Sequence, residues 1–437
     1  MADLSTTLAG IRSPNPFWLA SAPPTNTYGQ VARAFDAGWG GAVWKTIGQP
    51  IINVYSRYGG VDIGNQKLMG LNNIELITDR PVEDNIKEMA LVKKRYPKHA
   101  LIASLMVETK REAWHEIVKR TQGETGCDGF ELNFGCPHGM SERGMGAAVG
   151  QVPEYCAQIV GWVKEVSTIP VIVKLTPNVA DVVYPARAAK KAGGDAVSLI
   201  NTINSLISID LDTLTPRPNV NGQGSHGGYC GPAVKPIALN MVSAIASDPE
   251  TAGIPISGIG GISTWKDAAE FIALGCQTVQ VCTAVMHYGF RVVEDMIDGL
   301  SNWMDEKGYR TIEDFRGKAV PSIQKWENLD LNYFIKAHID EDKCIGCELC
   351  YIACEDGAHQ AMKVVSKMVN GVEKRLVNVI DEACVGCNLC SLVCPVPECI
   401  TMVRIENGAP RVSWKDFSAG KGKLAARPEH YHSVDEG

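Results

Sequence analysis

The sequence predicts an α/β protein in which a parallel (β/α)8 barrel is followed by a smaller, cysteine-rich module. Apolar, β-branched segments bounded by turn residues recur between stretches with helical periodicity, as expected for parallel strands that are buried on both faces. Two runs of four cysteines follow this alternation near the C-terminus. A chain of 437 residues exceeds one ordinary hydrophobic core, so at least two domains are expected.

Eight segments have the composition of barrel strands. They lie at residues 16–22, 41–47, 101–107, 129–135, 170–175, 196–201, 254–260 and 278–284. Residues 181–192 and 265–274 carry the helical pattern of outer helices. A doubly wound open sheet would show the same alternation and is the alternative fold. In a barrel, the functional side chains lie at the C-terminal ends of the strands and in the loops that follow.

The expected domain boundaries follow from composition. We expect the barrel at residues 1–304 and a polar and aromatic connector without a clear strand at residues 305–337. The cysteine-rich module is expected at residues 338–412. Residues 413–437 are rich in Gly and Lys and are expected to form a mobile tail.

Both cysteine runs have the spacing C-x-x-C-x-x-C-x-x-x-C, which is typical of bacterial ferredoxins with two [4Fe–4S] clusters. In that arrangement, three cysteines of one run and the fourth of the other bind each cluster. Pro395 after the second run fits the pattern, whereas Glu355 after the first run departs from it. The expected ligands are Cys344, Cys347, Cys350 and Cys394 for one cluster, and Cys354, Cys384, Cys387 and Cys390 for the other.

Two other interpretations of these cysteines are weaker. A zinc site closes with four ligands from two pairs, which leaves the third and fourth cysteines of each run without a role. Disulfides require an oxidising compartment. Two one-electron relays in one chain imply that the protein moves electrons between a source and an acceptor.

Polar residues and glycines lie where the expected strands end. They are Lys45, Asn133, Lys174, Asn201, Thr202, Gly260, Gly261, Cys282 and Thr283. Because a buried ammonium without a partner is costly, we expect the two lysines to face a bound anion or an electron-rich ring. Glycine-rich turns after the last two strands are typical of the phosphate site in such barrels. Together they predict a flavin mononucleotide (FMN) pocket, with the phosphate at Gly260, Gly261 and Thr283.

A cysteine follows the fourth expected strand, on a glycine-rich loop within residues 131–146. Cys136 is predicted to be a general acid that protonates one carbon of an activated C=C bond while hydride enters its neighbour. The alternative is a buried structural thiol. For His138, two residues further on, flavin contact and a simple role in the loop are equally open.

Three asparagines and a threonine are candidates for binding the substrate. Asn73, Asn133, Asn201 and the adjacent Thr202 offer both donors and acceptors, which a cyclic imide edge with alternating N–H and C=O groups requires. Any one asparagine alone is most often a turn or cap residue. Only their convergence at the strand ends favours a pyrimidine-like ligand.

The composition excludes several partners. A net charge of −7 and a pI near 5.8 give no electrostatic footprint for nucleic acid. Neither a signal peptide nor an apolar span is evident, so a cytoplasmic location without membrane contact is expected.

The G-x-G-x-x-G match at residues 222–227 follows no strand and opens no helix, so it is not a dinucleotide fingerprint. Reducing equivalents are therefore expected to arrive from a partner protein through the clusters.

The chain resembles the C-terminal half of the dihydropyrimidine dehydrogenases, and over nearly its whole length the bacterial PreA-type subunits of that family. The most specific parts of the resemblance are residues 133–146, residues 175–178 and Asn201-Thr202. It implies a barrel of the dihydroorotate dehydrogenase type followed by a ferredoxin-like module. It also implies the reversible reduction of uracil and thymine to their 5,6-dihydro forms. The implied partner is an FAD- and NAD-binding subunit of the PreT type, in a homodimer or heterotetramer.

The resemblance also implies roles for single residues. Cys136 would protonate C5 of the pyrimidine after hydride reaches C6. The implied pyrimidine contacts are Asn73, Asn133, Asn201 and Thr202. The implied flavin contacts are Ser21, Lys45, Lys174, Gly261, Cys282 and Thr283. Asn133 and Gly260 are also expected at the flavin.

Three other functions compete with this one. Dihydroorotate dehydrogenases share the barrel, the flavin and an Asn-x-x-Cys-Pro loop, and Lys45 could serve the carboxylate of orotate. Dihydrouridine synthases resemble the barrel but lack the clusters and would need a basic face. An electron carrier with a non-catalytic barrel is the alternative outside the enzymes.

Overall fold

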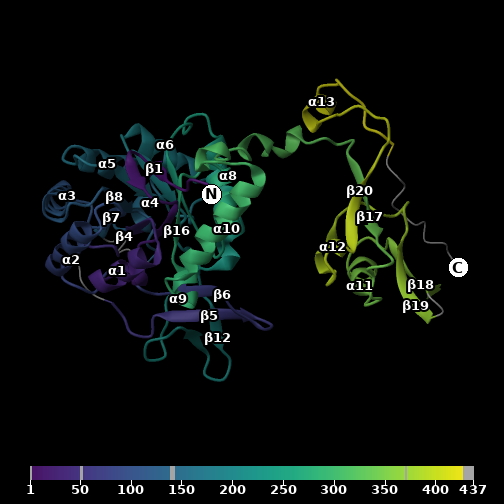
Figure 1. The fold of residues 1–437 in the computed structure, drawn as a ribbon, viewed down its shortest axis with the longest axis horizontal. Coiled ribbons are helices and arrows are strands. Elements are labelled where there is room, and N and C mark those ends of the chain that lie inside the picture. The colour runs from purple at the N-terminus through teal and green to yellow at the C-terminus, as the bar shows by residue number, and fades with distance from the viewer. Residues whose placement is uncertain (1, 50–52, 138–142, 370–371, 427–437) are drawn as a thin grey trace. The chain divides into compact units, whose positions relative to one another are not determined.

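The computed structural model describes residues 2–49, 53–137, 143–369 and 372–426 (Figure 1). It divides into two compact units, Met1–Ile323 and Gln324–Gly437. The division lies inside the expected connector. His138, which the sequence left open as a flavin contact, lies outside the described residues.

The first unit is a closed barrel of eight parallel strands, which confirms the predicted fold and excludes the open sheet. The ladder closes where β16 pairs with β3, at Val279 and Phe17. The strands are short and almost wholly buried, because helices cover the outer face and side chains fill the inside. They are β3 (Phe17–Leu19), β4 (Gly41–Val43), β7 (Ala100–Leu105), β8 (Gly129–Asn133), β9 (Val171–Lys174), β10 (Ala196–Leu199), β15 (Ile256–Ile259) and β16 (Thr278–Val281).

Helices surround this barrel and bury their apolar faces on it, as Figure 1 shows for α1, α2, α3, α5, α6 and α8. Thr264 starts α8 with a capping box, in which Asp267 N donates to Thr264 Oγ1 at 3.4 Å and Thr264 N donates to Asp267 Oδ2 at 2.8 Å. The helices of the first unit are α1 (Tyr28–Ala37), α2 (Val82–Arg95), α3 (Arg111–Thr125), α4 (Ala147–Gly150), α5 (Pro153–Lys164), α6 (Val183–Lys191), α7 (Lys235–Ser247), α8 (Trp265–Ala273), α9 (Thr283–Tyr288) and α10 (Val292–Lys307), with 3-10 turns at Pro23–Thr25, Pro232–Val234, Ile312–Asp314 and Val320–Ser322.

A hairpin of β1 (Thr6–Leu8) and β2 (Ile11–Ser13) closes the N-terminal end of the barrel. Its Leu8 and Ile11 are buried with Trp18, Ile102 and Ile172 in one apolar cluster. The sequence analysis did not anticipate this hairpin, because three-residue strands carry too little periodicity to be recognised.

A second, four-stranded sheet lies over the other end, where the barrel strands have their C-terminal ends. The order of its strands is β11-β14-β6-β5, so it joins segments from two separate barrel connections. Its strands are β5 (Tyr58–Ile63), β6 (Gln66–Asn73), β11 (Ile203–Ser205) and β14 (Gly227–Cys230), and a small hairpin of β12 (Ser208–Asp210) and β13 (Thr215–Arg217) lies beside them in sequence. The G-x-G-x-x-G match runs into β14 and not into a helix. We call this four-stranded sheet the roof.

The second unit has two similar halves, as the repeated cysteine spacing predicts. Each half has one short helix that begins within a cysteine run. The elements are β17 (Phe334–Ile339), α11 (Leu349–Glu355), β18 (Met362–Val369), β19 (Val372–Val379), α12 (Leu389–Val393), β20 (Ile400–Ile405) and α13 (Trp414–Ser418), with a 3-10 turn at Trp326–Asn328. β17 pairs with β20 and β18 pairs with β19, each antiparallel.

Two expectations about the ends of this module differ from the structure. The connector was expected to lack a strand, but β17 begins at Phe334 and pairs with β20. A mobile tail was expected at residues 413–437, but Ser413 caps helix α13 and Ala425 N donates to Asn332 Oδ1 at 2.9 Å, and residues 427–437 lie outside the described residues. Long-range hydrogen bonds of this kind leave no periodic trace in a sequence.

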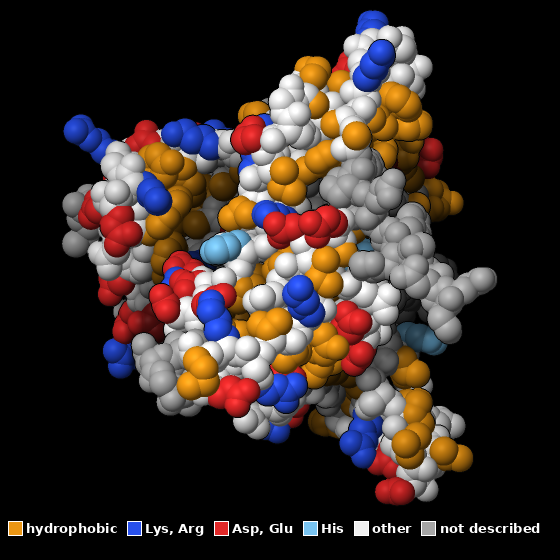
Figure 2. Space-filling view, turned by 90° about the vertical axis from the view of Figure 1, so that its right-hand side faces the viewer, with side chains coloured by type: hydrophobic (Ala, Val, Ile, Leu, Met, Phe, Trp, Pro, Cys, Tyr) orange, Lys and Arg blue, Asp and Glu red, His pale blue; other side chains and the backbone are white. Residues whose placement is uncertain are grey.

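The described helices include none that is both long and apolar enough to cross a lipid bilayer. On the face shown in Figure 2, acidic and basic side chains are interspersed and are not gathered by sign.

We predict that Leu8→Ala lowers the free energy of unfolding of the first unit by about 2–5 kcal/mol, because it empties a fully buried position at the barrel floor. Guanidinium denaturation followed by tryptophan fluorescence measures this loss. Leu211→Ala, at a position that is 82% exposed, is the control. Equal denaturation midpoints for the two variants would contradict the role of the hairpin.

Candidate functional site

One cavity opens at the C-terminal end of the barrel, beneath the roof. Its empty volume is about 1070 Å³, part of which is open solvent. Every residue that the sequence predicted for the flavin, the substrate or the proton lines it. These residues are Ser21, Lys45, Asn73, Asn133, Cys136, Lys174, Asn201, Thr202, Gly260, Gly261, Cys282 and Thr283.

The roof adds residues that the sequence analysis missed. Tyr58, Glu75, Tyr229, Cys230 and Gly231 also line the cavity. Glu75 could have been found, because it lies two residues after Asn73 in the same polar segment. The β14 residues gave no such indication, since nothing in their composition marks them as a strand that crosses a barrel mouth.

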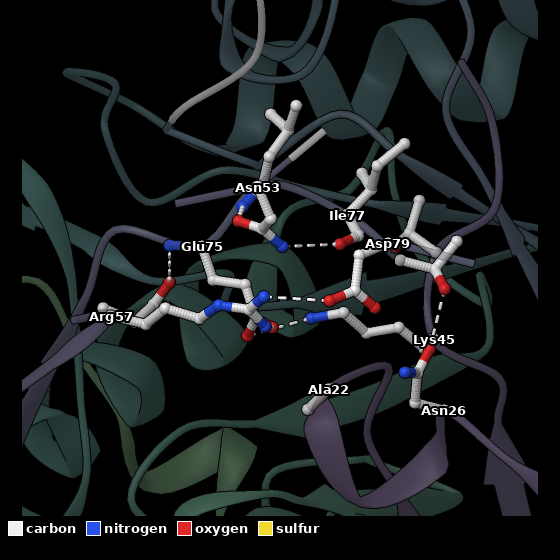
Figure 3. Close-up of polar contacts among 12 residues, drawn as sticks. Ala22, Asn26, Lys45, Asn53, Arg57, Glu75, Ile77 and Asp79 are labelled. Carbon is white, nitrogen blue, oxygen red and sulfur yellow. Dashed lines mark hydrogen bonds and ion pairs between the residues drawn. The ribbon is translucent and has the colours of Figure 1, made fainter. Parts of the chain in front are cut away.

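Lys45 is buried and forms an ion pair with Glu75, with 3.1 Å between Lys45 Nζ and Glu75 Oε2. Glu75 also accepts hydrogen bonds from Arg57 Nη1 at 2.9 Å and from the Tyr58 hydroxyl at 3.0 Å. Arg57 in turn donates to Asp79 at 2.8 Å. Figure 3 shows the side chains of Lys45, Glu75, Arg57 and Asp79 pointing toward one another, with positive and negative charges alternating. Burial and the neighbouring Glu75 raise the pKa of Tyr58, so its hydroxyl stays protonated and donates.

Lys174 is the second buried lysine, and its Nζ lies 3.4 Å from Glu131 Oε1. Glu131 points into the barrel, where its other oxygen accepts from Ser198 Oγ at 2.8 Å and from Gln280 Nε2 at 2.9 Å. The sequence analysis expected only a bound ligand to face the two lysines. That expectation is corrected, because the protein itself supplies a carboxylate to each of them.

The carboxamide groups are linked through hydrogen bonds. Asn201 Nδ2 donates to Asn133 Oδ1 at 3.0 Å, and Asn133 Nδ2 donates to Thr46 Oγ1 at 3.0 Å. Thr202 N donates to Asn201 Oδ1 at 2.8 Å. A side chain at Gly135 would lie 2.4 Å from Asn201 Cβ, so only glycine allows Asn201 this position. The predicted substrate residues of β8 and β10 therefore form one preorganised group.

Asn73 reaches the same cavity from the roof. Its Nδ2 donates to the carbonyl of Gly228 at 3.1 Å, which ties β6 to β14. Asn178 supports the group from behind, because its Nδ2 donates to the Thr202 carbonyl at 3.1 Å. The cavity thus presents carboxamides from two sides.

Cys136 lies between the cavity and a small apolar cluster. It is 5% exposed and packs with Ile77, Met106 and Met145. Its Sγ lies 3.6 Å from the carbonyl oxygen of Leu76. Cys136 is therefore held near Asn73 and Glu75 by the backbone that follows β6, and its thiol lines the same cavity.

Glycines and thiols form the far end of the cavity. Gly261 has a φ of +73°, and a side chain there would lie 2.7 Å from Lys235 Cβ, so the backbone can turn only with glycine. Thr283 Oγ1 donates to Cys230 Sγ at 3.3 Å. Burial raises the pKa of Cys230 to about 11 and that of Cys282 to about 12, so both thiols are neutral at physiological pH.

In the second unit, the eight run cysteines line two separate cavities. Cys344, Cys347 and Cys350 share one cavity with Cys394, and Cys384, Cys387 and Cys390 share the other with Cys354. This is the crossed grouping that the sequence predicts.

Sequence comparisons agree with this division. The profile of the dihydroorotate dehydrogenase family matches residues 3–304, and that of the 4Fe-4S dicluster domain matches residues 337–402. The NAD-dependent dihydropyrimidine dehydrogenase subunit PreA of Escherichia coli (strain K12) is 44% identical over 362 residues, which cover 83% of this chain and 87% of that protein.

Two further relatives match somewhat shorter parts of the chain. The chloroplastic dihydropyrimidine dehydrogenase (NADP(+)) of Arabidopsis thaliana is 44% identical over 329 residues, 73% of this chain and 77% of that protein. The catalytic subunit of dihydroorotate dehydrogenase B (NAD(+)) of Pyrococcus abyssi (strain GE5 / Orsay) is 38% identical over 317 residues, 72% of this chain and 99% of that protein. The chain therefore belongs to the dihydroorotate dehydrogenase family, and within it to the PreA-type subunits of dihydropyrimidine dehydrogenase.

Proposed function

We propose that this protein reversibly reduces the 5,6 double bond of uracil or thymine, with FMN in the barrel and electrons supplied through two [4Fe–4S] clusters. The observation that carries the proposal is the group of Asn133, Asn201 and Thr202, with Asn73 opposite, in one cavity with the Cys136 thiol. Carboxamides match the alternating donors and acceptors of a pyrimidine edge. The relatives named for dihydropyrimidine dehydrogenase support the same substrate.

The charges of the cavity favour an uncharged ring over dihydroorotate. Lys45 and Lys174 are the cations among the described lining residues, and Glu75 and Glu131 already pair with them. A substrate carboxylate would find no unpaired cation there and would lie close to Glu75. Burying an anion without a partner is costly, so a neutral base is the better ligand.

The residues present fit FMN. Gly260, Gly261 and Thr283 line one end of the cavity and would hold its phosphate, because backbone N–H groups of such turns can face an anion. Lys45 and Lys174 would face the electron-rich side of the ring, and Ser21, Asn133 and the neutral Cys282 would complete its surroundings. When bound, the flavin supplies or accepts the hydride and exchanges single electrons with the clusters.

Cys136 would hold the proton of the reaction on its Sγ and give it to the ring carbon next to the one that receives hydride. The carboxamides would fix the ring so that this carbon faces the thiol. The roof would exclude water from the reacting atoms. In the reverse direction the same sulfur takes the proton back.

The electrons would reach the barrel through the second unit. We propose that the clusters are bound by the two crossed sets of cysteines, and that a partner subunit with FAD and an NAD site delivers the electrons. The relative from Escherichia coli is a subunit of an NAD-dependent enzyme, which supports a partner of this kind.

The flavin spectrum tests the substrate. Anaerobic addition of dihydrouracil to the purified protein should bleach the flavin absorbance, whereas dihydroorotate should leave it unchanged. Bleaching by dihydroorotate alone would assign the protein to dihydroorotate oxidation. An absence of bleaching with either compound would favour an electron carrier with a non-catalytic barrel.

We predict that Cys136→Ala lowers kcat by about 10²–10⁴ while FMN and iron content stay at the wild-type level, because only the proton donor is removed. Steady-state kinetics and cofactor analysis measure the two effects. Cys156→Ala is the matched control, since Cys156 is buried in α5 and does not line the cavity. Wild-type turnover by the Cys136 variant would rule out the thiol as the acid.

We predict that Glu75→Gln tightens the binding of orotate about tenfold relative to uracil, because Lys45 and Arg57 lose their shared carboxylate and attract an anion. Spectroscopic titration of the bound flavin with each ligand measures the ratio. Glu124→Gln at the exposed C-terminal end of α3 removes the same charge from a residue that does not line the cavity and should leave the ratio unchanged. An unchanged ratio in the Glu75 variant would refute the charge argument.

A further inference from the structure

We propose that Cys399, a cysteine outside both runs, donates a hydrogen bond to the cluster held by Cys344, Cys347, Cys350 and Cys394 and makes that cluster easier to reduce. Cys399 is 2% exposed and directly precedes β20. It lines the cavity of those four cysteines. The inference depends on the clusters of the second unit and not on the substrate of the barrel.

The backbone of the two halves shows which residue occupies the equivalent place at the other cluster. In one half, Asp340 N donates to the Cys399 carbonyl at 2.8 Å and Cys344 N donates to the Asp340 carbonyl at 3.0 Å. In the other half, Ile380 N donates to the Ala361 carbonyl at 2.8 Å and Cys384 N donates to the Ile380 carbonyl at 3.0 Å. Cys399 is therefore the counterpart of Ala361.

This equivalence shows that the side chains at the Cys399 and Ala361 positions give the two cavities different chemistry there. Ala361 is 3% exposed, directly precedes β18 and lines the cavity of Cys354, Cys384, Cys387 and Cys390. A methyl group there can make only van der Waals contact. Cys399 places a thiol at the same position of the other cavity, and a thiol can donate a hydrogen bond.

The surroundings of Cys399 leave the cluster as its strongest acceptor. Its Sγ donates a long hydrogen bond of 3.7 Å to the Asp340 carbonyl, which also accepts from Cys344 N, so the sulfurs of a bound cluster would compete with this oxygen for the thiol proton. Apart from the four run cysteines, the described lining of this cavity consists of apolar residues and Glu348, whose carboxylate is an acceptor and pairs with Arg375 at 3.0 Å. Among the described residues that line this cavity, apart from the four run cysteines, Cys399 is thus the one whose side chain can donate a hydrogen bond.

Reduction adds one negative charge to a cluster, and a hydrogen bond to its sulfurs stabilises the reduced state more than the oxidised state. Removing the thiol should therefore lower the reduction potential of this cluster. The other cluster should not respond, because its cavity contains Ala361 at that position.

The test is a redox titration of the anaerobic full-length protein, followed by electron paramagnetic resonance. Cys399→Ala should move one cluster midpoint to lower potential, by up to tenfold in the reduction equilibrium, or 59 mV, and leave the other unchanged. Alanine is tolerated at the equivalent position, so the substitution preserves the fold. Cys399→Ser restores a donor and should lie closer to the wild type.

Ala361→Cys is the reciprocal variant. It adds a thiol to the other cavity and should raise the midpoint that Cys399→Ala leaves unchanged. Iron and sulfide content at the wild-type level shows that both clusters are present. Unchanged midpoints in both variants, or equal shifts of the two midpoints in Cys399→Ala, would overturn the proposal. If Cys399→Ala loses a cluster, the Ala361→Cys titration alone tests the proposal. In that case, the absence of an upward shift of the midpoint in Ala361→Cys overturns the proposal.

Discussion

Two buried ion pairs at the mouth of the barrel are the constraint on which the site depends. Lys45 follows β4 and Lys174 ends β9, with two other strands between them, and burying either ammonium without a carboxylate would be costly. Glu131 pairs with Lys174 from inside the barrel. Glu75 pairs with Lys45 from the segment that follows the roof strand β6. The second pair therefore also fastens the roof to the barrel. The ion pair of Lys45 and Glu75 therefore contributes both to the charge of the cavity and to the attachment of its cover.

The same pairs divide the cavity into regions of different chemistry. One end has glycines and neutral thiols, which suit a phosphate held by backbone groups. The centre has two compensated lysines, and the side beneath the roof has carboxamides around Cys136. An electron-rich ring system and a small uncharged ring can occupy these regions together. This ordering explains how the barrel of a dihydroorotate dehydrogenase can serve a base that lacks a carboxylate.

The barrel was predictable from the sequence because its strands are continuous apolar segments, and the polar residues at their ends mark the site. Lys45, Asn133, Lys174 and Asn201 were found in this way. The roof was not predictable, because β5, β6, β11 and β14 are short, glycine-rich or polar and take their partners from distant connections. Glu75 was missed with the roof. Glu131 was missed because a charged residue in a buried strand has no partner visible in sequence, and the order of residues 413–426 rests on contacts with Asn332 that periodicity does not encode.

The crossed grouping of the cysteines has a consequence for how such a protein can be assembled from parts. Each cluster cavity is completed by one cysteine from the opposite half, Cys394 in one case and Cys354 in the other. The chain could be divided near residue 323, between the two units. Each part would then keep all the residues that line its own cavities. A division between the cysteine runs would leave each fragment with only three of the four cysteines that line one cavity. The part of the chain that binds the clusters can therefore be transferred to another protein only with both cysteine runs together.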